Sequence, residues 1–265
     1  MSMVEVASSG TQDLVRAALD IASALPEPRP LWFRGHECPS HTLVSSLARR
    51  VSTPEELFEK ERRLITRFRQ RSLPFWPAGY PQNDWEQLFA MQHHGIPTRL
   101  LDWSENLFVA LYFASRAHAH ADEKSCNPIV WAIDPIGWNR DVPHLRGTSD
   151  EIGIMTTDSE DLDRYAPISP GSALPRRYVQ PVSLYGTYNS ARIVAQRGTF
   201  TVAGNSLEPL ESFADGASAP NLWRVEITAP RAEIASDLSS LGFTESMIFP
   251  DLSGVSREIV ALENI

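Results

Sequence analysis

The sequence predicts an α+β fold, with helices mostly in the N-terminal half packed on a mainly antiparallel sheet from the central and C-terminal parts. Three observations support this class. Segments with the apolar period of amphipathic helices dominate the first 120 residues. Short runs rich in β-branched and aromatic residues follow residue 127. Helices and strands do not alternate regularly, which disfavours a repeating βαβ arrangement.

Five helices are expected in the first half of the chain, over residues 11–25, 42–50, 53–72, 83–94 and 105–120. Thr53 and Glu56 form a capping box around Pro54, which is a strong helix start. Gly95 is expected to end the fourth helix. The fifth helix is apolar nearly all round, so we expect it to be central in the fold.

The expected strands are residues 31–34, 100–103, 128–134, 182–188, 191–194, 199–202 and 222–227. Gly198, between the fifth and sixth of these, predicts a hairpin. Two further helices are expected over residues 231–241 and 253–262. Residues 1–10 are expected to be a frayed tail. Residues 137–175, rich in Gly, Pro, Asp and Ser, are expected to form a long surface excursion.

Length and composition indicate one domain over residues 1–265, because this length is near the upper limit of a single hydrophobic core. The hydrophobic and charged fractions, 42% and 22%, exclude disorder of the whole chain. Cys38 and Cys126 are too few for a disulfide framework, so a reducing compartment is the simpler interpretation. No apolar run approaches the roughly 20 residues of a membrane span, and no signal pattern opens the chain. We therefore expect a cytoplasmic protein with no membrane partner.

The formal net charge of −9 disfavours unspecific adhesion to nucleic acid. One stretch is locally basic, with the side chains Lys60, Arg62, Arg63, Arg67, Arg69 and Arg71. The favoured interpretation is the solvated face of an amphipathic helix. The alternative is a docking face for an anionic partner.

The segment Trp32–His36 is the first that indicates chemistry. Arg34 ends an apolar strand, where its five donors need partners, and its planar fork suits phosphate or carboxylate. Gly35 allows backbone or ligand to approach closely. An ion pair with an internal carboxylate is an equally favoured role for the arginine.

The segment Gln92–Ser104 is the second. Gln92 falls on the apolar stripe of its helix, so its amide needs backbone partners or a ligand to avoid a cost of about 1–3 kcal/mol. His93 and His94 are adjacent and do not share a helix face, which argues against a metal site.

Other polar residues give weaker signals. Arg99 and Asp102 are expected to pair across the turn that precedes the central helix. Arg192 and Gln196 lie on or beside a predicted core strand. The sequence contains no phosphate-binding glycine loop, no serine-hydrolase elbow and no zinc helix.

These segments together resemble the FRG domain, which is named for a Phe-Arg-Gly strand, here Phe33–Gly35. Gln92–Trp103 resembles the Gln-His-x-Gly-x-Pro-Thr-Arg-Leu-Leu-Asp-Trp run of that family, and Ala110–Ala114 resembles its Ala-Leu-Tyr-Phe-Ala helix. Weaker similarities lie at residues 192–200 and 241–252. The resemblance implies a single FRG-type domain with a core over about residues 30–260.

The resemblance also implies a layout similar to that of mono-ADP-ribosyltransferases, including their sheet. In those enzymes an arginine on the first core strand grips the pyrophosphate of NAD, and Arg34 matches it in type and place. Their catalytic glutamate has no match, because Arg192 occupies the corresponding position. Another carboxylate is needed to stabilise an oxocarbenium-like state. Asp102 is the first choice, and Glu37 and Glu226 are alternatives.

The resemblance therefore implies an ADP-ribosyltransferase-like toxin or anti-phage effector that consumes NAD as substrate. Its target would be a nucleic acid, such as RNA, or a protein, and an antitoxin protein would be a further partner. The residues assigned to catalysis are Asp102, His94 and Arg99. Those assigned to ligand binding are Arg34, Gly35, His36, Gln92, Thr98, Trp103, Ser104, Arg192 and Gln196.

Two alternatives remain open. The first is a non-catalytic module that binds a nucleotide, RNA or a protein, which the missing glutamate favours. The second is a nuclease or nucleotide hydrolase in which His94 and Asp102 act as acid and base.

Overall fold

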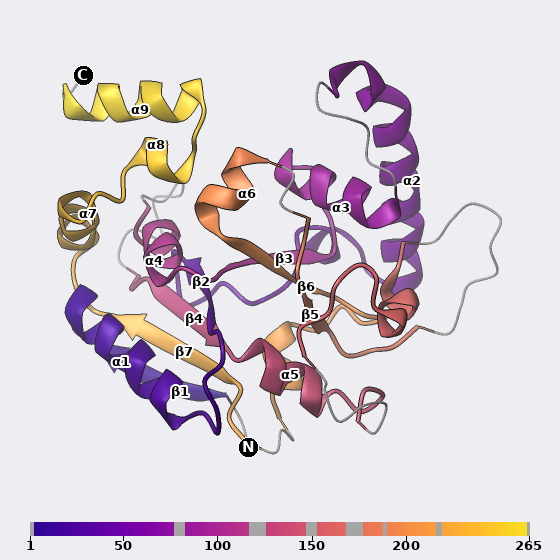
Figure 1. Cartoon of the computed structure of the whole chain (residues 1–265), viewed down its shortest axis with the longest axis horizontal. Helices are drawn as coiled ribbons and strands as arrows, with labels where there is room; N and C mark the ends of the chain where they lie inside the picture. Colours follow the sequence, from indigo (N-terminus) through magenta and orange to yellow (C-terminus); the bar gives the residue numbers. More distant parts are fainter. Residues whose placement is uncertain are drawn as a thin grey trace.

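The computed structural model describes residues 3–76, 83–116, 126–146, 153–167, 177–187, 190–215 and 219–263. Within these residues the centre is a seven-stranded sheet of order β1-β7-β4-β2-β3-β6-β5 (Figure 1). Its strands are β1 (Val4–Ser8), β2 (Trp32–His36), β3 (Leu100–Ser104), β4 (Ile129–Ile133), β5 (Val182–Leu184), β6 (Gly198–Val202) and β7 (Leu222–Ile227). Neighbouring strands are antiparallel except β1 and β7, which are parallel. The predicted α+β class with a mainly antiparallel sheet is confirmed.

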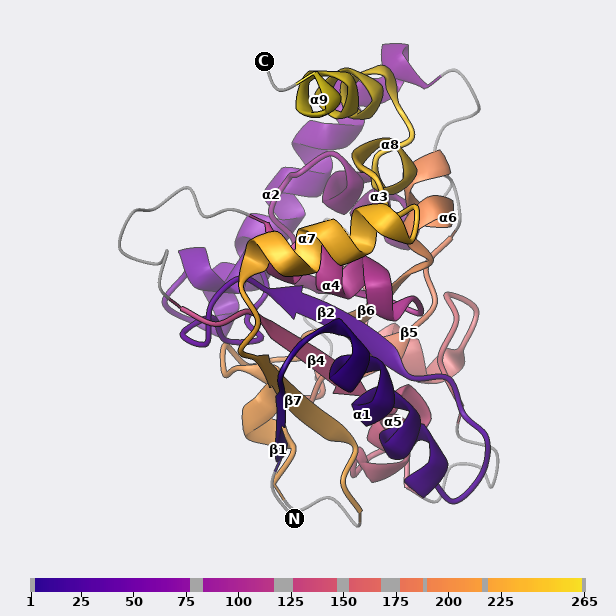
Figure 2. The same cartoon turned by 90° about the vertical axis from the view of Figure 1, so that its left-hand side faces the viewer.

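Helices cover both faces of this sheet. They are α1 (Thr11–Ala24), α2 (Pro54–Ser72), α3 (Asp84–His93), α4 (Leu107–Ser115), α5 (Pro135–Asp141), α6 (Ala191–Gln196), α7 (Arg231–Ser240), α8 (Glu245–Ile248) and α9 (Leu252–Leu262). Short 3₁₀ helices occur at Ala48–Arg50, Leu73–Phe75, Glu160–Tyr165 and Leu210–Phe213. One apolar cluster joins α1, α4 and α7 to one face (Figure 2). A second, larger cluster joins α2, α3 and α5 to the other face.

The division into an N-terminal helical half and a later sheet is wrong. Three of the seven strands come from the first 104 residues, and α6 to α9 all follow residue 190. Residues 1–10 are not a frayed tail, because Val4–Ser8 forms β1 and pairs with β7 from Val4 opposite Trp223 to Ser8 opposite Ile227. The alternating Val4 and Val6 side chains pack against the α1 face of the sheet.

The strand expected over residues 191–194 is helix α6. The hydroxyl of Ser190 accepts a hydrogen bond from the backbone N–H of Ile193 at 3.3 Å and so caps the helix. Arg197, at φ 46°, ends it in the left-handed region. β6 then starts at Gly198, so the predicted hairpin at this glycine is wrong as well. Local capping here overrides the strand preference of the β-branched pair at 193 and 194.

Other expected elements are shorter than predicted. In residues 42–50 only Ala48–Arg50 is helical, as a single 3₁₀ turn. The central helix α4 ends at Ser115, and residues 117–120 of the predicted helix lie outside the described part of the chain.

The stretch 137–175 is not a surface excursion in its described part. Trp138, Val142, Leu145, Leu162 and Tyr165 are all buried. The Trp138 indole N–H donates to the carbonyl of Pro181 at 2.8 Å, which ties α5 to the chain leading into β5. Residues 147–152 and 168–175 lie outside the described residues. The polar composition of the stretch hid the few large apolar residues that anchor it.

Cys38 and Cys126 form a disulfide, with their Cα atoms 5.4 Å apart. It joins the loop after β2 to the segment before β4, two strands that are neighbours in the sheet. The inference of a reducing compartment from the two cysteines is therefore not supported. Among the described helices, none has the length and apolar character that a membrane crossing requires.

Candidate functional site

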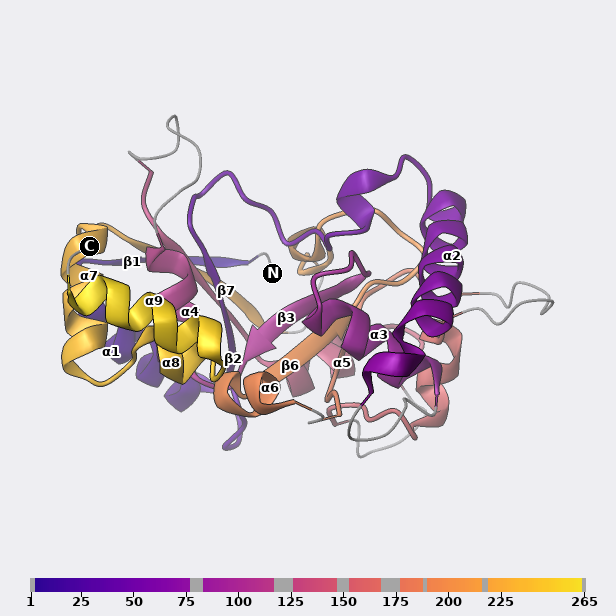
Figure 3. The same cartoon turned by 90° about the horizontal axis from the view of Figure 1, so that it is seen from above.

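A cleft of about 770 Å³ opens among β2, β3, α3, α4 and α6, which lie together in Figure 3. Nine of the predicted site residues line it: Arg34, Gly35, His36, Gln92, Asp102, Trp103, Ser104, Arg192 and Gln196. The sequence analysis did not assign the other lining residues to ligand binding or catalysis, except that Glu37 was an alternative carboxylate. They are Phe33, Glu37, His41, Arg49, Phe89, His93, Val109, Ala110, Phe113, Ile193 and Phe200. The two sequence segments that indicated chemistry thus meet at one site.

Arg34 lies on the central strand β2 with its guanidinium in this cleft. Its Nη1 donates to the backbone carbonyl of Asp102 at 2.6 Å, and its Nε donates to His36 Nε2 at 3.0 Å. No described carboxylate lies within ion-pair distance of it, so the predicted alternative of an internal ion pair is wrong within this part of the chain. Burial lowers the pKa of Arg34, and the nearby Asp102 charge opposes that shift. The guanidinium therefore presents a positive charge to the cleft.

His36 fixes the orientation of that guanidinium. Because Arg34 Nε always carries a proton, His36 Nε2 must accept this hydrogen bond, and only the neutral imidazole can do so. Nδ1 lies 3.0 Å from the carbonyl oxygen of His41 and 3.2 Å from the indole Nε1 of Trp131. Burial, with a further contribution from the Arg34 charge, lowers the pKa of His36 to about 3. His36 is therefore neutral at physiological pH, which is the state that this hydrogen bond requires.

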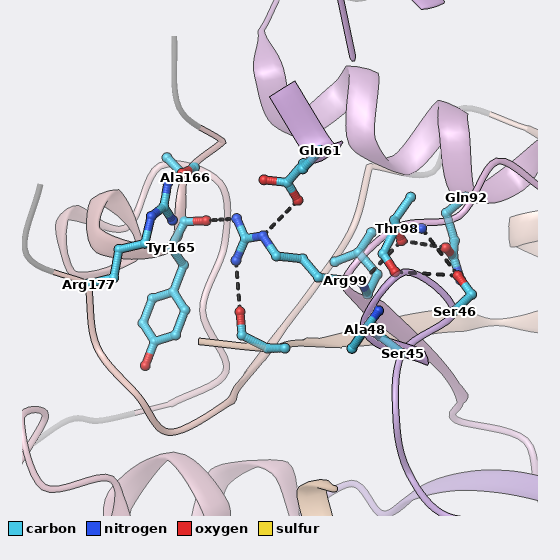
Figure 4. A network of polar contacts seen from close by, with 12 residues as sticks. Ser45, Ser46, Ala48, Glu61, Gln92, Thr98, Arg99, Tyr165, Ala166 and Arg177 are labelled. Atoms are coloured by element: carbon cyan, nitrogen blue, oxygen red, sulfur yellow. Dashed lines mark hydrogen bonds and ion pairs between the residues drawn. The ribbon is translucent and has the colours of Figure 1, made fainter. Parts of the chain in front are cut away.

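Asp102 is the exposed residue of the otherwise buried strand β3, and its carboxylate lines the cleft. Gln92 Nε2 donates to Asp102 Oδ2 at 2.7 Å. Gln92 Oε1 in turn accepts from the hydroxyl of Thr98 at 2.5 Å, and that hydroxyl accepts from the N–H of Leu100 at 3.1 Å. Thr98 is fully buried and does not line the cleft, so it contacts the site through Gln92 (Figure 4). The chain of donors leaves the Gln92 amide only one orientation, toward Asp102.

Arg99 does not lie in the cleft, and its predicted pairing with Asp102 is wrong. Its side chain points away from Gln92 and Thr98 into a fully buried cluster, which we call the Arg99 hub (Figure 4). Nε donates to Glu61 Oε1 at 2.7 Å, Nη1 donates to the carbonyl of Ala203 at 2.8 Å, and Nη2 donates to the carbonyl of Tyr165. The hub joins α2, the residue before β3, the 3₁₀ helix Glu160–Tyr165 and the residue after β6. Its position argues for a structural role and against catalysis.

His94 also lies outside the cleft. It caps the C-terminal end of α3, is exposed, and has its ring centroid 6.5 Å from that of Trp76. His93 lines the cleft instead, with Nδ1 3.3 Å from the hydroxyl of Ser190. Burial lowers the pKa of His93, so this imidazole also favours its neutral form. Adjacent residues near a helix end point in different directions, and the sequence alone did not show which one faces the site.

Several predicted ligand-binding residues are used to build the walls of the cleft. A Cβ atom on Gly35 would lie 1.9 Å from the carbonyl oxygen of Ala110, so the glycine is required by the close packing of α4 on β2. The Ser104 hydroxyl donates to the carbonyl of Gln196 at 2.6 Å, and the Gln196 amide donates to the carbonyl of Ile248 at 3.0 Å. These contacts hold β3, α6 and α8 together. Trp103 is buried and donates to the Thr201 hydroxyl at 3.1 Å.

The charged groups that line the cleft are mostly positive. The cleft is lined by the guanidinium groups of Arg34, Arg49 and Arg192 and by the carboxylates of Glu37 and Asp102. Arg49 was not predicted, because its only sequence signal is a basic pair at 49 and 50 in a short helical turn. The excess of guanidinium groups favours an anionic ligand. Glu226, an alternative carboxylate, is not among the residues that line the cleft, and it accepts a hydrogen bond from the amide of Asn127 at 2.8 Å.

The basic stretch on α2 is largely paired with carboxylates of the chain. The ion pairs are Lys60–Glu56, Arg62–Glu59, Arg63–Glu59 and Arg69–Asp84. This arrangement favours the solvated face of a helix over a docking face.

Residues 29–123 match the family model of the FRG domain. Over this part the chain is similar to the FRG domain. The match spans β2, α2, α3, β3 and α4, and so includes Arg34, Gln92 and Asp102. The comparisons with curated proteins and with solved structures found no match. The residues that match the family model therefore supply one side of the cleft, and α6, with Arg192 and Gln196, supplies another.

Proposed function

We propose that the cleft binds NAD and that the chain transfers its ADP-ribose group to a target. One observation carries this proposal. A guanidinium with no described carboxylate partner and the carboxylate of Asp102 lie in the same cleft, and Arg34 is hydrogen-bonded to the backbone of Asp102 itself at 2.6 Å. A phosphate clamp and a group that stabilises positive charge are thus coupled through a single contact.

Arg34 and Arg49 supply the anion-binding part of the proposed site. Both line the cleft, and a planar guanidinium binds phosphate oxygens in a bidentate manner. The volume of about 770 Å³ falls in the range of ligand and cofactor pockets. The rings of Phe89, Phe113 and Phe200 contribute apolar walls for the flat rings of a dinucleotide.

Asp102 supplies the negative charge that the reaction needs. The bond between C1′ of the ribose and the nicotinamide nitrogen breaks, and nicotinamide leaves as a neutral molecule with the bonding electron pair. The positive charge that develops on the ribose is stabilised by the carboxylate of Asp102. A nucleophile of the target then bonds to C1′, and its proton passes to Asp102 and on to solvent. Gln92 orients the carboxylate by donating to Oδ2 at 2.7 Å.

The test measures free nicotinamide after the purified protein is incubated with NAD, alone and with RNA, DNA or cell protein. We expect release by the wild-type chain and a loss of about 100-fold or more in Arg34→Gln and Asp102→Asn. Arg63→Gln is the matched control, because Arg63 is an α2 arginine whose side chain is 62% exposed. Equal release by Arg34→Gln and Arg63→Gln, with both proteins folded, would contradict the proposal.

A second candidate is a nucleotide-binding module without turnover. Arg192, which lines the cleft, favours it, because this position corresponds to the catalytic glutamate of the enzymes that the sequence resembles. Thermal stabilisation by NAD without nicotinamide release would support this candidate. A nuclease or hydrolase that uses His94 and Asp102 is not favoured, because His94 does not line the cleft.

A further inference from the structure

Three arginines from different elements surround one phenyl ring beside the cleft. The guanidinium carbons of Arg116, Arg192 and Arg257 lie 5.7, 4.8 and 5.1 Å from the ring centroid of Phe249. They follow α4, belong to α6 and belong to α9, respectively. Because each distance refers to the same centroid, no two of the charges are more than about 11 Å apart, which is close to the Debye length of about 10 Å at 0.1 M salt. We call this group the arginine triad.

Two members of the triad have no ion pair among the described residues. Arg257 is paired with Glu245 at 2.5 Å. Arg116 is exposed and Arg192 is half-buried, and neither side chain has a hydrogen bond to the described part of the chain. Burial lowers the pKa of Arg192, and the carboxylates of Asp102 and Asp251 oppose that shift. The guanidinium donors of Arg116 and Arg192 are therefore available to a ligand, and stacking on the ring offsets only part of the cost of bringing like charges together.

The triad borders the cleft. Arg192 lines the cleft and also belongs to the triad. Phe113 lines the cleft and packs edge-on against Phe249, with the ring centroids 6.1 Å apart. A ligand whose anionic group is bound by Arg116 and Arg192 can therefore extend past Arg192 into the cleft.

We propose that the arginine triad docks the phosphodiester backbone of a single-stranded nucleic acid, which is the target of the cleft. This role as target site rests on the proposed function, whereas the binding itself does not. Guanidinium forks bind phosphate oxygens in a bidentate manner, and two of them side by side follow a repeating anionic backbone. The apolar cleft wall next to Arg192 accepts a base that has left its stack. A single strand presents such a base at the lowest cost.

The experiment measures fluorescence anisotropy of labelled oligo(U) and oligo(dT) of about 12 nucleotides, titrated with the full chain at about 50 and 200 mM salt. The variants are Arg116→Gln and Arg192→Gln, and Arg63→Gln is the control. We expect each triad variant to weaken binding about tenfold. We also expect each to lower the slope of log affinity against log salt by about 0.7, the value for one phosphate contact on a single strand. The control should match the wild type, and a thermal melt checks that every variant is folded.

Three outcomes would overturn this inference. They are equal binding by Arg116→Gln and Arg63→Gln, no binding of either oligonucleotide at about 50 mM salt, and binding of poly-glutamate as tight as that of the oligonucleotides. The last result would assign the triad to an acidic protein. Tighter binding of oligo(U) than of oligo(dT), or the reverse, identifies the strand as RNA or DNA.

Nicotinamide release without nucleic acid separates this inference from the proposed function. Arg116 does not line the cleft, so Arg116→Gln should release nicotinamide from NAD at the wild-type rate. One result would be that neither the wild-type protein nor any variant releases nicotinamide while Arg116→Gln still weakens oligonucleotide binding. That result would contradict the proposed function and support the docking site. If nicotinamide is released and Arg116→Gln binds oligonucleotides normally, the docking site fails alone.

Discussion

The cleft and the Arg99 hub each contain an arginine from the segments that indicated chemistry, yet they are built in opposite ways. Arg34 has no described carboxylate partner and faces a cavity of about 770 Å³. Arg99 is 0% exposed, is paired with a buried Glu61, and donates to two backbone carbonyls. Its guanidinium also lies over the Phe58 ring, 5.3 Å from the centroid. A buried charge whose three nitrogens each donate to a group of the protein maintains the fold, whereas a charge with no carboxylate partner in a cleft is available to a ligand.

Substitution of each arginine tests this contrast most strongly. Arg99→Gln should lower the free energy of unfolding by about 3–5 kcal/mol, because Glu61 is left as an uncompensated buried charge. Arg34→Gln should lower it by less than about 1 kcal/mol. Urea denaturation of the three proteins measures both values. Arg99→Met combined with Glu61→Leu should recover most of the loss, and equal losses in the two single variants would remove the distinction between the regions.

Gly35→Ala tests the packing that places Arg34 in the cleft. The added Cβ would meet the backbone of Ala110 at 1.9 Å, and backbone cannot rotate away. We expect a loss of about 1–3 kcal/mol in the free energy of unfolding, as for an overpacked core, together with weaker NAD binding. Gly153→Ala is the control, since nothing lies within 4 Å of a Cβ at that position. A Gly35→Ala protein as stable as this control would show that α4 can move off β2 freely.

The pH dependence of stability tests the neutral state of His36. Its folded pKa of about 3 is below the unfolded value of 6.5, so between these values the unfolded chain binds the extra proton. The contribution of His36 is complete above pH 6.5 and is lost as the pH falls toward 3, by about 1.4 kcal/mol per pH unit. His36→Asn should reduce the slope of unfolding free energy against pH, measured by denaturant titration between about pH 6 and 4. An unchanged slope would mean that His36 is not held neutral beside Arg34.

Substitution of Thr98 gives the smallest expected effect. Thr98 links the two regions, because it precedes Arg99 in the sequence and its hydroxyl donates to Gln92 Oε1. Thr98→Val removes the donor to Gln92 Oε1 while keeping the shape of the side chain. If the proposed function holds, nicotinamide release should fall about tenfold, since the amide no longer has a single orientation toward Asp102. Thr98→Ser should restore release. Failure of the serine variant to do so, while it remains as stable as the wild type, would assign Thr98 a purely structural role.

Much of the fold could be predicted because periodicity and capping act locally. The helix begun by Thr53 and the strand Leu222–Ile227 are found where the pattern places them. Errors arose where a short element depends on distant partners. β1 is an edge strand stabilised by pairing with β7, which is more than 200 residues away in the sequence. The disulfide depends likewise on the adjacency of β2 and β4.

The site could be predicted in part, since the residue types that form it are concentrated in two segments. Arg34, Gln92 and Asp102 meet as expected. The direction in which each side chain points could not be predicted. Arg99 and Asp102 belong to the same segment, but only Asp102 lines the cleft. Likewise, His93 lines the cleft and His94 does not. Arg49 comes from a separate turn that only the tertiary structure brings to the cleft.

The most direct measurement of the central claim is the affinity of the folded protein for NAD, determined by isothermal titration calorimetry for the wild type, Arg34→Gln and Arg63→Gln. The account predicts equal dissociation constants for the wild type and Arg63→Gln. It predicts binding at least about tenfold weaker for Arg34→Gln, which corresponds to the loss of a hydrogen bond to a charged group. Wild-type affinity in a folded Arg34→Gln protein would contradict the claim that this guanidinium and Asp102 serve one ligand.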